Sequence, residues 1–423
     1  MYVEQPPGYI VKGEENKVYR LRRALYDLKQ APHAWYNRIE AYFLKEGFEK
    51  CPYEHTLFIK KSTHGTSLLL VCLYVDDLIF TGNDEILFSS FKHSMMKEFD
   101  MTDLGRMRYF LGLEVLQRAD GIFICQIKYA QEVLERFNMA GCNVVYNPVV
   151  PGFKLVANSV GMAINNTQYM QMVGSMIYLT SIRPGIMFVV NLLSRYLAHP
   201  TELHLQAVKK VLRYIKGTLS YGIFYKQSGN TELLAYTDSD YAGNLEDRKS
   251  TSGFLFVLSS GAVSWSLKKQ PVLTLSTTEA EFIAAASCAC QAVWLRRMLE
   301  NLDNASAETT IIYCDNSSTI KLSKNPVMHG RSKHIDVRFH FLRDLTRDGV
   351  VTLMHCCSCR RMRDVATNRP PSKCMGKYIS SKYGETRSSL SLSSEKWCGS
   401  RHLVFWSLGT LTGLRDRVRG LVA

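Results

Sequence analysis

The sequence lacks any apolar run long enough to cross a membrane, and no secretory signal peptide is recognisable at Met1. It also lacks the evenly spaced cysteines of a disulfide framework. Its 12 cysteines are scattered, and several stand in apolar contexts, such as Cys72, Cys125 and Cys314. Scattered cysteines of this kind are typical of reduced core thiols. These absences predict an intracellular protein with no membrane contact.

Two common patterns of catalytic or metal-binding residues are missing as well. A histidine and three cysteines crowd together in His355-Cys356-Cys357-Ser358-Cys359, but zinc sites usually need separated ligand pairs. No Ser–His–Asp arrangement suited to covalent catalysis stands out. Any catalytic chemistry is therefore expected to depend on carboxylates.

What the chain does have is length and positive charge. Its 423 residues suffice for two or three domains, and a hydrophobic content of 46% allows sizeable cores. The net charge is +14 and the sequence pI about 9.2. Such an excess suits a protein that binds phosphates, although a generic basic protein would carry it too.

The most informative stretch is Tyr74-Val75-Asp76-Asp77, which lies between two apolar runs, residues 68–73 and 78–80. Both runs are rich in strand formers, and residues 81–84 (TGND) end the second one. The pattern predicts a β-hairpin with two aspartates at its tip. A divalent ion such as Mg²⁺ would offset their repulsion; a solvated turn is the alternative interpretation.

Longer motifs surround this hairpin. Residues 74–82 read YVDDLIFTG, residues 21–36 read LRRALYDLKQAPHAWY, and residues 101–115 read MTDLGRMRYFLGLEV. Together with YVEQPPGYI at residues 2–10, these segments resemble the reverse transcriptase of copia-type LTR retrotransposons. The resemblance continues to about residue 355. It implies a polymerase palm in which Asp76 and Asp77 are catalytic metal ligands.

The order of elements predicts an α+β palm and thumb remnant followed by an α/β ribonuclease H-like domain. Helices are expected at 34–43, 85–99, 129–137 and 169–216, and strands at 109–115 and 122–125. The predicted domains are a truncated reverse transcriptase at 1–147, a linker and helical connection at 148–230, a ribonuclease H-like domain at 231–368 and a degenerate or disordered basic tail at 369–423.

In the third segment, strands are expected at 233–237, 254–258, 262–266 and 309–314. Ser276-Thr277-Thr278-Glu279 is a capping-box sequence that should open a long helix ending near Leu299. Antiparallel strands, a helix and a further strand form an order that fits a ribonuclease H fold.

Acidic residues stand at the ends of these elements. Asp238 follows a strand, Glu281 lies near the helix start, and Asp315 follows a second strand. Each acid alone is most simply a surface residue. Three or four acids at one sheet edge, however, can hold two Mg²⁺ ions, with Mn²⁺ as the alternative ion. The segments around them resemble the copia-type ribonuclease H domain, which implies that Asp238, Glu281 and Asp315 are metal ligands and that Asp364 is a weaker fourth match.

Basic residues provide candidate contacts to nucleic acid. In the helical segment 169–216, one face is apolar and four cations crowd the rest of the circumference; a phosphate-tracking helix and a solvated surface are the two interpretations. The candidates in the chain are Lys209, Lys210, Arg213, Lys216, Lys268, Lys269, Arg331, Lys333 and Arg338. His334 and His340 could assist proton transfer, although a packed or solvated role is the simpler interpretation.

The chain departs from the family pattern in four places. It begins after the motif that supplies the third polymerase carboxylate, so we expect no polymerisation by this chain alone. Asp27 replaces a family glycine, which should weaken nucleotide or template binding through bulk and charge. Gly185 replaces a family aspartate, and the resemblance fades after about residue 357.

The resemblance therefore implies a fragment of a retrotransposon Pol polyprotein, located in a cytoplasmic particle or the nucleus. Its expected activity is metal-dependent hydrolysis of RNA in RNA/DNA hybrids. Its expected partners are that hybrid, template-primer nucleic acid and other Pol segments. The alternatives are a catalytically dead nucleic-acid-binding remnant and a pseudogene product that rarely folds.

Overall fold

The structure is a computed structural model, and it divides into two compact units, Met1–Glu98 and Phe99–Ala423. It describes residues 2–21, 30–62, 67–149, 155–156, 162, 164–227, 232–258, 260–303, 309–325 and 336–356. Among the described residues, no helix is both long and apolar enough to cross a membrane.

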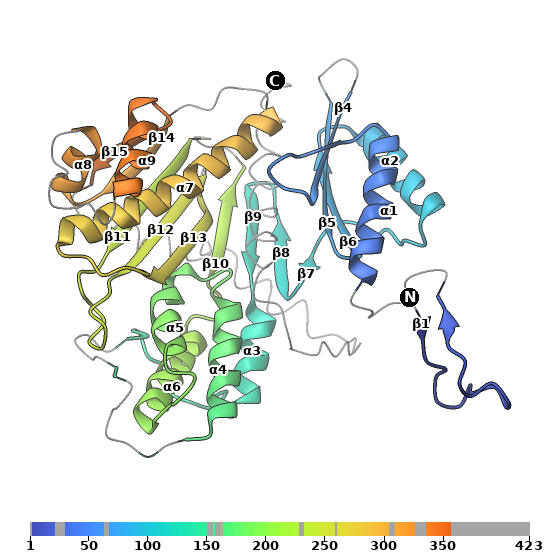
Figure 1. Cartoon of the computed structure of the whole chain (residues 1–423), viewed down its shortest axis with the longest axis horizontal. Helices are drawn as coiled ribbons and strands as arrows, with labels where there is room; N and C mark the ends of the chain where they lie inside the picture. Colours follow the sequence, from blue (N-terminus) through green and yellow to red (C-terminus); the bar gives the residue numbers. More distant parts are fainter. Residues whose placement is uncertain are drawn as a thin grey trace. The chain divides into compact units, whose positions relative to one another are not determined.

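The first unit is built on a four-stranded antiparallel sheet covered by two helices (Figure 1). The strands, in spatial order, are β3 (Glu49–Lys50), β4 (Leu57–Lys61), β5 (Leu68–Tyr74) and β6 (Asp77–Gly82), and the helices are α1 (Ala31–Lys45) and α2 (Glu85–Glu98). The Phe43 ring of α1 lies 4.8 Å from Phe58 and 6.2 Å from Phe91 of α2. These aromatic contacts join both helices to one face of the sheet, and they bury enough apolar area to dominate the core energetics.

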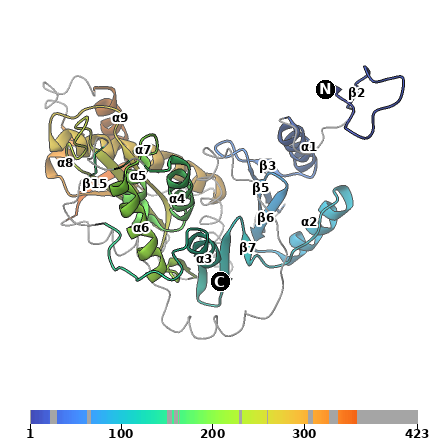
Figure 2. The same ribbon diagram turned by 90° about the horizontal axis from the view of Figure 1, so that it is seen from below.

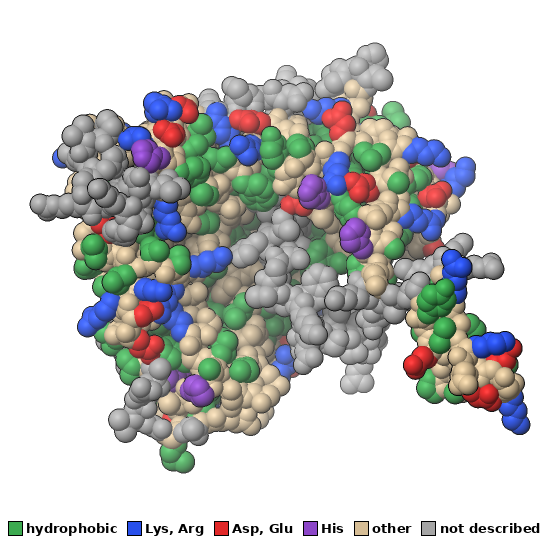
Figure 3. All heavy atoms as spheres, in the orientation of Figure 1, with side chains coloured by type: hydrophobic (Ala, Val, Ile, Leu, Met, Phe, Trp, Pro, Cys, Tyr) green, Lys and Arg blue, Asp and Glu red, His purple; other side chains and the backbone are tan. Residues whose placement is uncertain are grey.

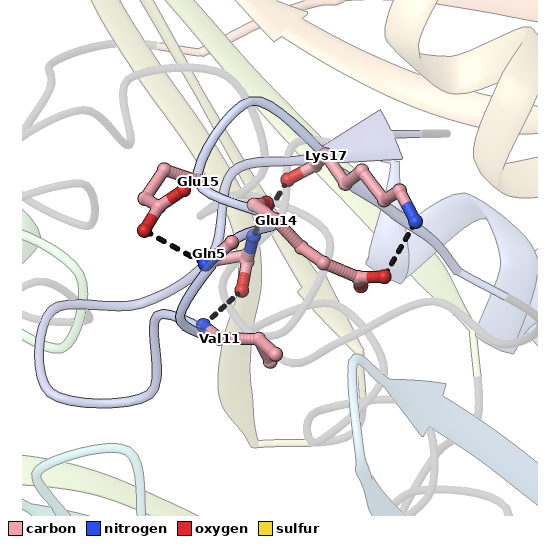
Figure 4. Close-up of polar contacts among 6 residues, drawn as sticks. Gln5, Val11, Glu14, Glu15 and Lys17 are labelled. Carbon is pink, nitrogen blue, oxygen red and sulfur yellow. Dashed lines mark hydrogen bonds and ion pairs between the residues drawn. The ribbon is translucent and has the colours of Figure 1, made fainter.

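An exposed segment at the start of this unit is organised by one side chain. Strands β1 (Tyr2–Val3) and β2 (Tyr19–Arg20) pair, and Gln5 lies inside the loop between them (Figure 4). Its Nε2 donates to the carbonyls of Glu14 (2.7 Å) and Lys17 (3.0 Å), and its Oε1 accepts from Val11 N (2.8 Å). A single amide therefore satisfies backbone groups from three points of the loop.

The second unit begins with another antiparallel sheet, in the order β10 (Gly222–Lys226), β9 (Gly121–Cys125), β8 (Leu113–Gln117), β7 (Tyr109–Phe110). The prediction of one strand over 109–115 was wrong, because the chain turns at Leu111 and Gly112, both with positive φ. Strand β9 pairs with β10 along its whole length. The sheet therefore joins residues placed on either side of the predicted boundary at 147.

A helical cluster packs beside this sheet in the same unit. It contains α3 (Ile127–Arg136), α4 (Asn166–Leu179), the 3₁₀ turn η1 (Pro184–Ile186), α5 (Met187–Ser194) and α6 (Glu202–Gly217), as Figures 1 and 2 show. Tyr169 and Leu212 are fully buried in its core. Helix α6 opens with a reciprocal cap in which Thr201 N donates to Nδ1 of the buried His204 at 3.0 Å.

The third layer of the unit is a five-stranded sheet with helices against it (Figure 1). Its spatial order is β13 (Gly261–Lys269), β12 (Thr251–Leu258), β11 (Leu233–Ser239), β14 (Thr310–Cys314), β15 (Val351–His355). The first three strands are antiparallel, and β11, β14 and β15 run parallel. Helix α7 (Thr277–Asp303) crosses the sheet, with α8 (Ser317–Lys324) and α9 (Asp336–Arg347) beside it. The predicted strands and long helix are confirmed.

Two hydrogen bonds connect the parts of the second unit. The Tyr225 hydroxyl of β10 donates to the Ala262 carbonyl at 2.6 Å, and Trp265 Nε1 donates to the Thr180 carbonyl at 3.0 Å. All four residues are at least nine-tenths buried. Strand β13 is thus tied to the other sheet and to the helical cluster. Both bonds stabilise this packing, since leaving buried polar groups unpaired would be costly.

Replacing Gly185 by Asp is expected to stabilise the second unit. Gly185 is exposed and lies in η1, directly before α5. Glycine costs up to about 1 kcal/mol in helical conformation, and a carboxylate near a helix N-terminus is favourable. The free energy of unfolding, measured by urea titration, should rise by about 1 kcal/mol. Gly185→Ala is the control without charge and should gain less; a loss of stability in Gly185→Asp would contradict the prediction.

Candidate metal centre

Two acids stand side by side at the ends of neighbouring parallel strands. Tyr236 of β11 is the register partner of Tyr313 of β14. Asp238 and Asp315 each lie two residues further along, so the same alternation of side chains places them on one face and at one edge of the sheet. Asp238 is half-buried and Asp315 is exposed.

The third acid reaches this edge from the start of α7. Ser276 precedes the helix, and its Oγ accepts from Glu279 N at 3.2 Å, while a Glu279 carboxylate oxygen accepts from Leu275 N at 2.7 Å. These bonds fix the helix start. Two residues on, Glu281 turns toward the sheet, and its Oε1 accepts from the backbone N–H of Ser239 at 3.1 Å. The side chain of Glu281 is thereby held beside Asp238.

Burial and the neighbouring acids both affect the protonation of Glu281. Burial, followed by the negative charges of Asp238 and Asp315, raises the pKa of Glu281 to about 8. A buried carboxylate among like charges is costly to ionise unless a cation compensates it. The residue is only 6% exposed. The negative charges at this edge of the sheet would therefore be compensated by a divalent cation.

The structure adds one residue that the sequence interpretation had assigned only to the core. Ligand atoms of Glu281, Cys314 and Asp315 all lie within 4.8 Å of one another. Cys314 is buried, and its Sγ donates to Glu281 Oε2 at 4.0 Å. Burial raises the pKa of the Cys314 thiol to about 12, so it is a neutral donor when no metal is bound. Its position directly before Asp315 is the sequence feature that could have identified Cys314 as a candidate ligand.

The donor set fits Mg²⁺ in its oxygen atoms. Carboxylates from Asp238, Glu281 and Asp315 are the hard ligands that this ion prefers, usually with several waters retained. The bond from Ser239 N fixes the orientation of Glu281, and burial among other acids makes its negative charge costly. Both features favour a bound divalent cation. The thiol does not fit a magnesium shell, because sulfur is a soft ligand.

The aspartates of the first unit occupy a different setting. Tyr74 and Asp77 are register partners across the β5–β6 hairpin, so Val75 and Asp76 form its two-residue turn, and the predicted hairpin is confirmed. Val75 has φ +54°, which is strained for a β-branched residue. Its carbonyl accepts from Trp35 Nε1 at 2.6 Å. The tryptophan thus helps to hold the turn.

Asp76 and Asp77 are both exposed. Partial desolvation and the neighbouring Asp76 charge raise the pKa of Asp77. Within the described ranges, the only group of three or more candidate ligands close enough to hold an ion is Glu281, Cys314 and Asp315. The hairpin aspartates therefore form a pair rather than a three-ligand site among the residues that the structure describes.

Two of the predicted nucleic-acid-binding lysines lie at the same end of the sheet as the acids. Ser239 of β11 pairs with Ser252 of β12, which pairs with Lys268 of β13. Lys268 is exposed, and Lys269 forms an ion pair with Asp247 at 2.7 Å. Over the face seen in Figure 3, Lys and Arg side chains are interspersed with acidic ones.

The cations of α6 have mixed surroundings. Arg213 Nε donates to the Asn143 carbonyl at 2.8 Å, and Lys216 Nζ donates to the Cys142 carbonyl at 2.6 Å. Both therefore tie the chain after α3 to α6, whereas Lys209 is exposed and Lys210 is half-buried. Arg338 lies on α9. Their role in binding nucleic acid stays a prediction, as does that of Arg331 and Lys333, which with Asp27, His334 and Asp364 fall outside the described residues.

Behind the acids, Gln270 connects three elements. Its Nε2 donates to Ser252 Oγ (2.5 Å), to the Ala280 carbonyl (3.0 Å) and to Ser239 Oγ (3.3 Å). The residue is 4% exposed. It therefore joins the start of α7, which carries Glu281, to the ends of β11 and β12. This role was not predicted, because no local sequence feature distinguishes a buried glutamine after a strand.

Replacing Gln270 by Met is expected to destabilise the second unit. The change keeps the volume but leaves the Ala280 carbonyl without this donor, and a lost buried hydrogen bond costs about 1–3 kcal/mol. Urea unfolding would measure the change. Gln291→Met is the matched control, since Gln291 is half-buried and donates to Ser264 Oγ at 3.2 Å. Equal losses in the two variants would contradict a special role for Gln270.

These features define the class of the protein. A helix-covered antiparallel sheet with a two-aspartate hairpin forms an α+β polymerase palm. A mixed sheet of order β13-β12-β11-β14-β15, with acids at its edge, is a ribonuclease H-like α/β fold. The predicted fold class is thus confirmed.

Comparison with known proteins supplies the family. Residues 1–151 match the family model described as reverse transcriptase (RNA-dependent DNA polymerase). The chain is 38% identical to the Pol polyprotein from transposon RE1 of Arabidopsis thaliana over 92% of its length and 26% of the relative's. It is 36% identical to that from transposon TNT 1-94 of Nicotiana tabacum over 88% of its length and 28% of the relative's. The chain belongs to the copia-type LTR retrotransposon Pol polyproteins, and it spans about a quarter of the length of these curated relatives.

Among solved structures, the chain is similar to a foamy viral protease-reverse transcriptase in complex with an RNA/DNA hybrid. The TM-score is 0.47 and the sequence identity is 12%, over 90% of this chain and 42% of that one.

Proposed function

We propose that the second unit of this Pol fragment hydrolyses the RNA strand of RNA/DNA hybrids with the help of two Mg²⁺ ions. The observation that carries the proposal is the strand register that places Asp238 and Asp315 at one edge of the sheet, together with the bond from Ser239 N that holds Glu281 at that edge. Three acids held at one sheet edge by strand register and a capped helix suit two-metal hydrolysis. Mn²⁺ would serve the same ligands.

In this proposal the residues have different roles in binding the metal ions and the hybrid. Bound metal ions would activate the attacking water and stabilise the leaving 3′-oxygen. Asp238 and Asp315 present carboxylate oxygens from parallel strands, and Glu281 is oriented by the Ser239 N–H. Lys268 lies at the same end of the sheet and would pair with a backbone phosphate of the hybrid.

The direct test uses a hybrid whose RNA strand is labelled at one end. Cleavage of the RNA is expected with Mg²⁺ and should stop on chelation, while single-stranded RNA and duplex DNA should stay intact. Binding that weakens with salt but gives no cleavage would leave a nucleic-acid-binding remnant and refute the nuclease proposal.

We further propose that this chain alone does not polymerise DNA. Support comes from the hairpin aspartates, which are exposed and which, among the residues described, have no third ligand close enough to share an ion. Two-metal chemistry needs such ligands to hold both ions. Primer extension with template, deoxynucleotides and Mg²⁺ tests this proposal, and templated synthesis by the purified protein would refute it.

A further inference from the structure

The edge of the five-stranded sheet carries one ligand atom that magnesium does not use. The thiol of Cys314 lies in the group whose ligand atoms are within 4.8 Å of one another, with carboxylate oxygens of Glu281 and Asp315. The side chain of Cys314 is 1% exposed, and its Sγ points at Glu281 Oε2 from 4.0 Å. A sulfur donor directed toward two carboxylates is the ligand set of a softer ion than Mg²⁺.

We propose that Glu281, Cys314 and Asp315 form a binding site for a thiophilic divalent cation, Zn²⁺ or Cd²⁺. The site overlaps the magnesium site of the proposed function, so the ion displaces Mg²⁺ and inhibits hydrolysis. The overlap rests on that proposed function, whereas the cation site itself does not. On binding, the Cys314 S–H bond breaks, a sulfur–metal bond forms, and the proton leaves to solvent.

The backbone holds the three ligands firmly. The Cys314 carbonyl accepts from Cys356 N at 3.1 Å, and the Asp315 carbonyl lies 3.1 Å from His355 Nε2, so β15 anchors both residues. Asn316 caps α8 directly after them by accepting from Thr319 N at 3.0 Å. Glu281 is fixed from the other side by Ser239 N. Glu281 and Cys314 therefore come from α7 and β14, and Asp315 lies in the short link between β14 and α8.

The geometry needs only a small contraction. Zinc–sulfur and zinc–oxygen bonds of about 2.3 Å and about 2.1 Å in a tetrahedral shell place neighbouring ligand atoms roughly 3.5 Å apart. The atoms here lie within 4.8 Å of one another, so side-chain shifts of about 1 Å bring them onto one ion. Water can supply the fourth position.

Cadmium binding can be observed without any enzymatic activity. The purified full chain, free of Mg²⁺, is titrated with Cd²⁺ while the ultraviolet cadmium–thiolate charge-transfer band is recorded. Cys314→Ser should lose the tightest-binding part of the band, and Cys290→Ser, which removes an exposed thiol from α7, should keep it. A Cys314→Ser titration that matches the wild-type curve would overturn the proposal.

Two further variants separate a built site from a mere loss of one thiol. Glu281→Gln and Asp315→Asn keep every cysteine, and each should weaken the tightest cadmium binding about tenfold or more because one charged ligand is lost. Unchanged affinity in both variants would mean that Cys314 binds cadmium without the carboxylates, which contradicts the proposed ligand set.

The overlap has its own test. Mg²⁺ added at increasing concentration should reduce the Cys314-dependent band, and coexistence of both ions without competition would refute the overlap. If the protein cleaves hybrids, Zn²⁺ should inhibit it, and Cys314→Ser should need about tenfold more Zn²⁺ for half inhibition at the same Mg²⁺ concentration. If it cleaves nothing, the cadmium titration still decides the cation site, so the two proposals fail independently.

Discussion

Asp238→Asn should reduce cleavage of the RNA strand in an RNA/DNA hybrid by about a thousandfold or more, because the proposed metal centre would lose one charged ligand. The substitution is isosteric, and Asp238 is half-buried at the end of β11. It also removes one of the two neighbouring charges that raise the pKa of Glu281, so the folded state should not suffer. Initial cleavage rates at saturating Mg²⁺ measure the effect.

A matched control removes a carboxylate elsewhere in the same unit. Asp344 lies on α9 and pairs with Arg347 at 3.3 Å on the surface. Asp344→Asn should cleave at the wild-type rate, since exposed pairs of this kind contribute about 0–1 kcal/mol to stability. Asp238→Asn should still bind the hybrid, and with less repulsion its affinity without metal should be at least that of the wild type. Cleavage by Asp238→Asn at the wild-type rate would remove Asp238 from the site.

Local patterns predicted the elements that carry the chemistry. The apolar runs around Asp76 and Asp77 predicted the hairpin, and the serine before α7 predicted its start, because turn and cap signals act within a few residues. The capping-box pattern assigned Glu279 to the helix start, whereas the family resemblance assigned Glu281 to the metal ligands. Glu279 bonds to the backbone before the helix, whereas Glu281 contacts the sheet.

What the sequence could not predict depends on contacts between distant residues. Strand β9 pairs with β10, about a hundred residues later, and no local feature names a strand's partner. The contact of Cys314 Sγ with Glu281 depends on the approach of α7 to β14, and the role of Gln270 depends on the approach of α7 to β11 and β12. The parallel register of β11 with β14, which brings Asp238 beside Asp315, became visible only in the folded chain.

Glu281→Gln should abolish hydrolysis and, without metal, stabilise the folded protein at high pH. Burial and the charges of Asp238 and Asp315 raise the pKa of Glu281 to about 8, well above the value of about 4.5 for an unperturbed glutamate. Between these values, the unfolded chain releases the proton that the folded chain keeps. The contribution of protonated Glu281 to the free energy of unfolding is therefore fully present below about pH 4.5 and is lost as the pH rises toward about 8.

The variant carries no such proton, so its free energy of unfolding should exceed that of the wild type by about 1–3 kcal/mol at about pH 9 in the presence of a chelator. At about pH 5 the two proteins should differ little. Glu279→Gln is the control from the same helix turn and should be no more stable than the wild type at either pH, because Glu279 supports the helix start.

With Mg²⁺ present, the free energy of unfolding of the wild type should exceed that of Glu281→Gln. An ion that binds only the folded state stabilises it by RT ln(1 + [Mg²⁺]/Kd), and the wild type has the carboxylate that the variant lacks. Urea unfolding at about pH 9 without Mg²⁺ therefore measures how much Glu281 destabilises the metal-free fold. The same titration with Mg²⁺ measures how much Glu281 adds to stabilisation by the ion. If Mg²⁺ stabilised wild type and Glu281→Gln equally, Glu281 would not be a metal ligand, and its raised pKa would be a cost of burial alone.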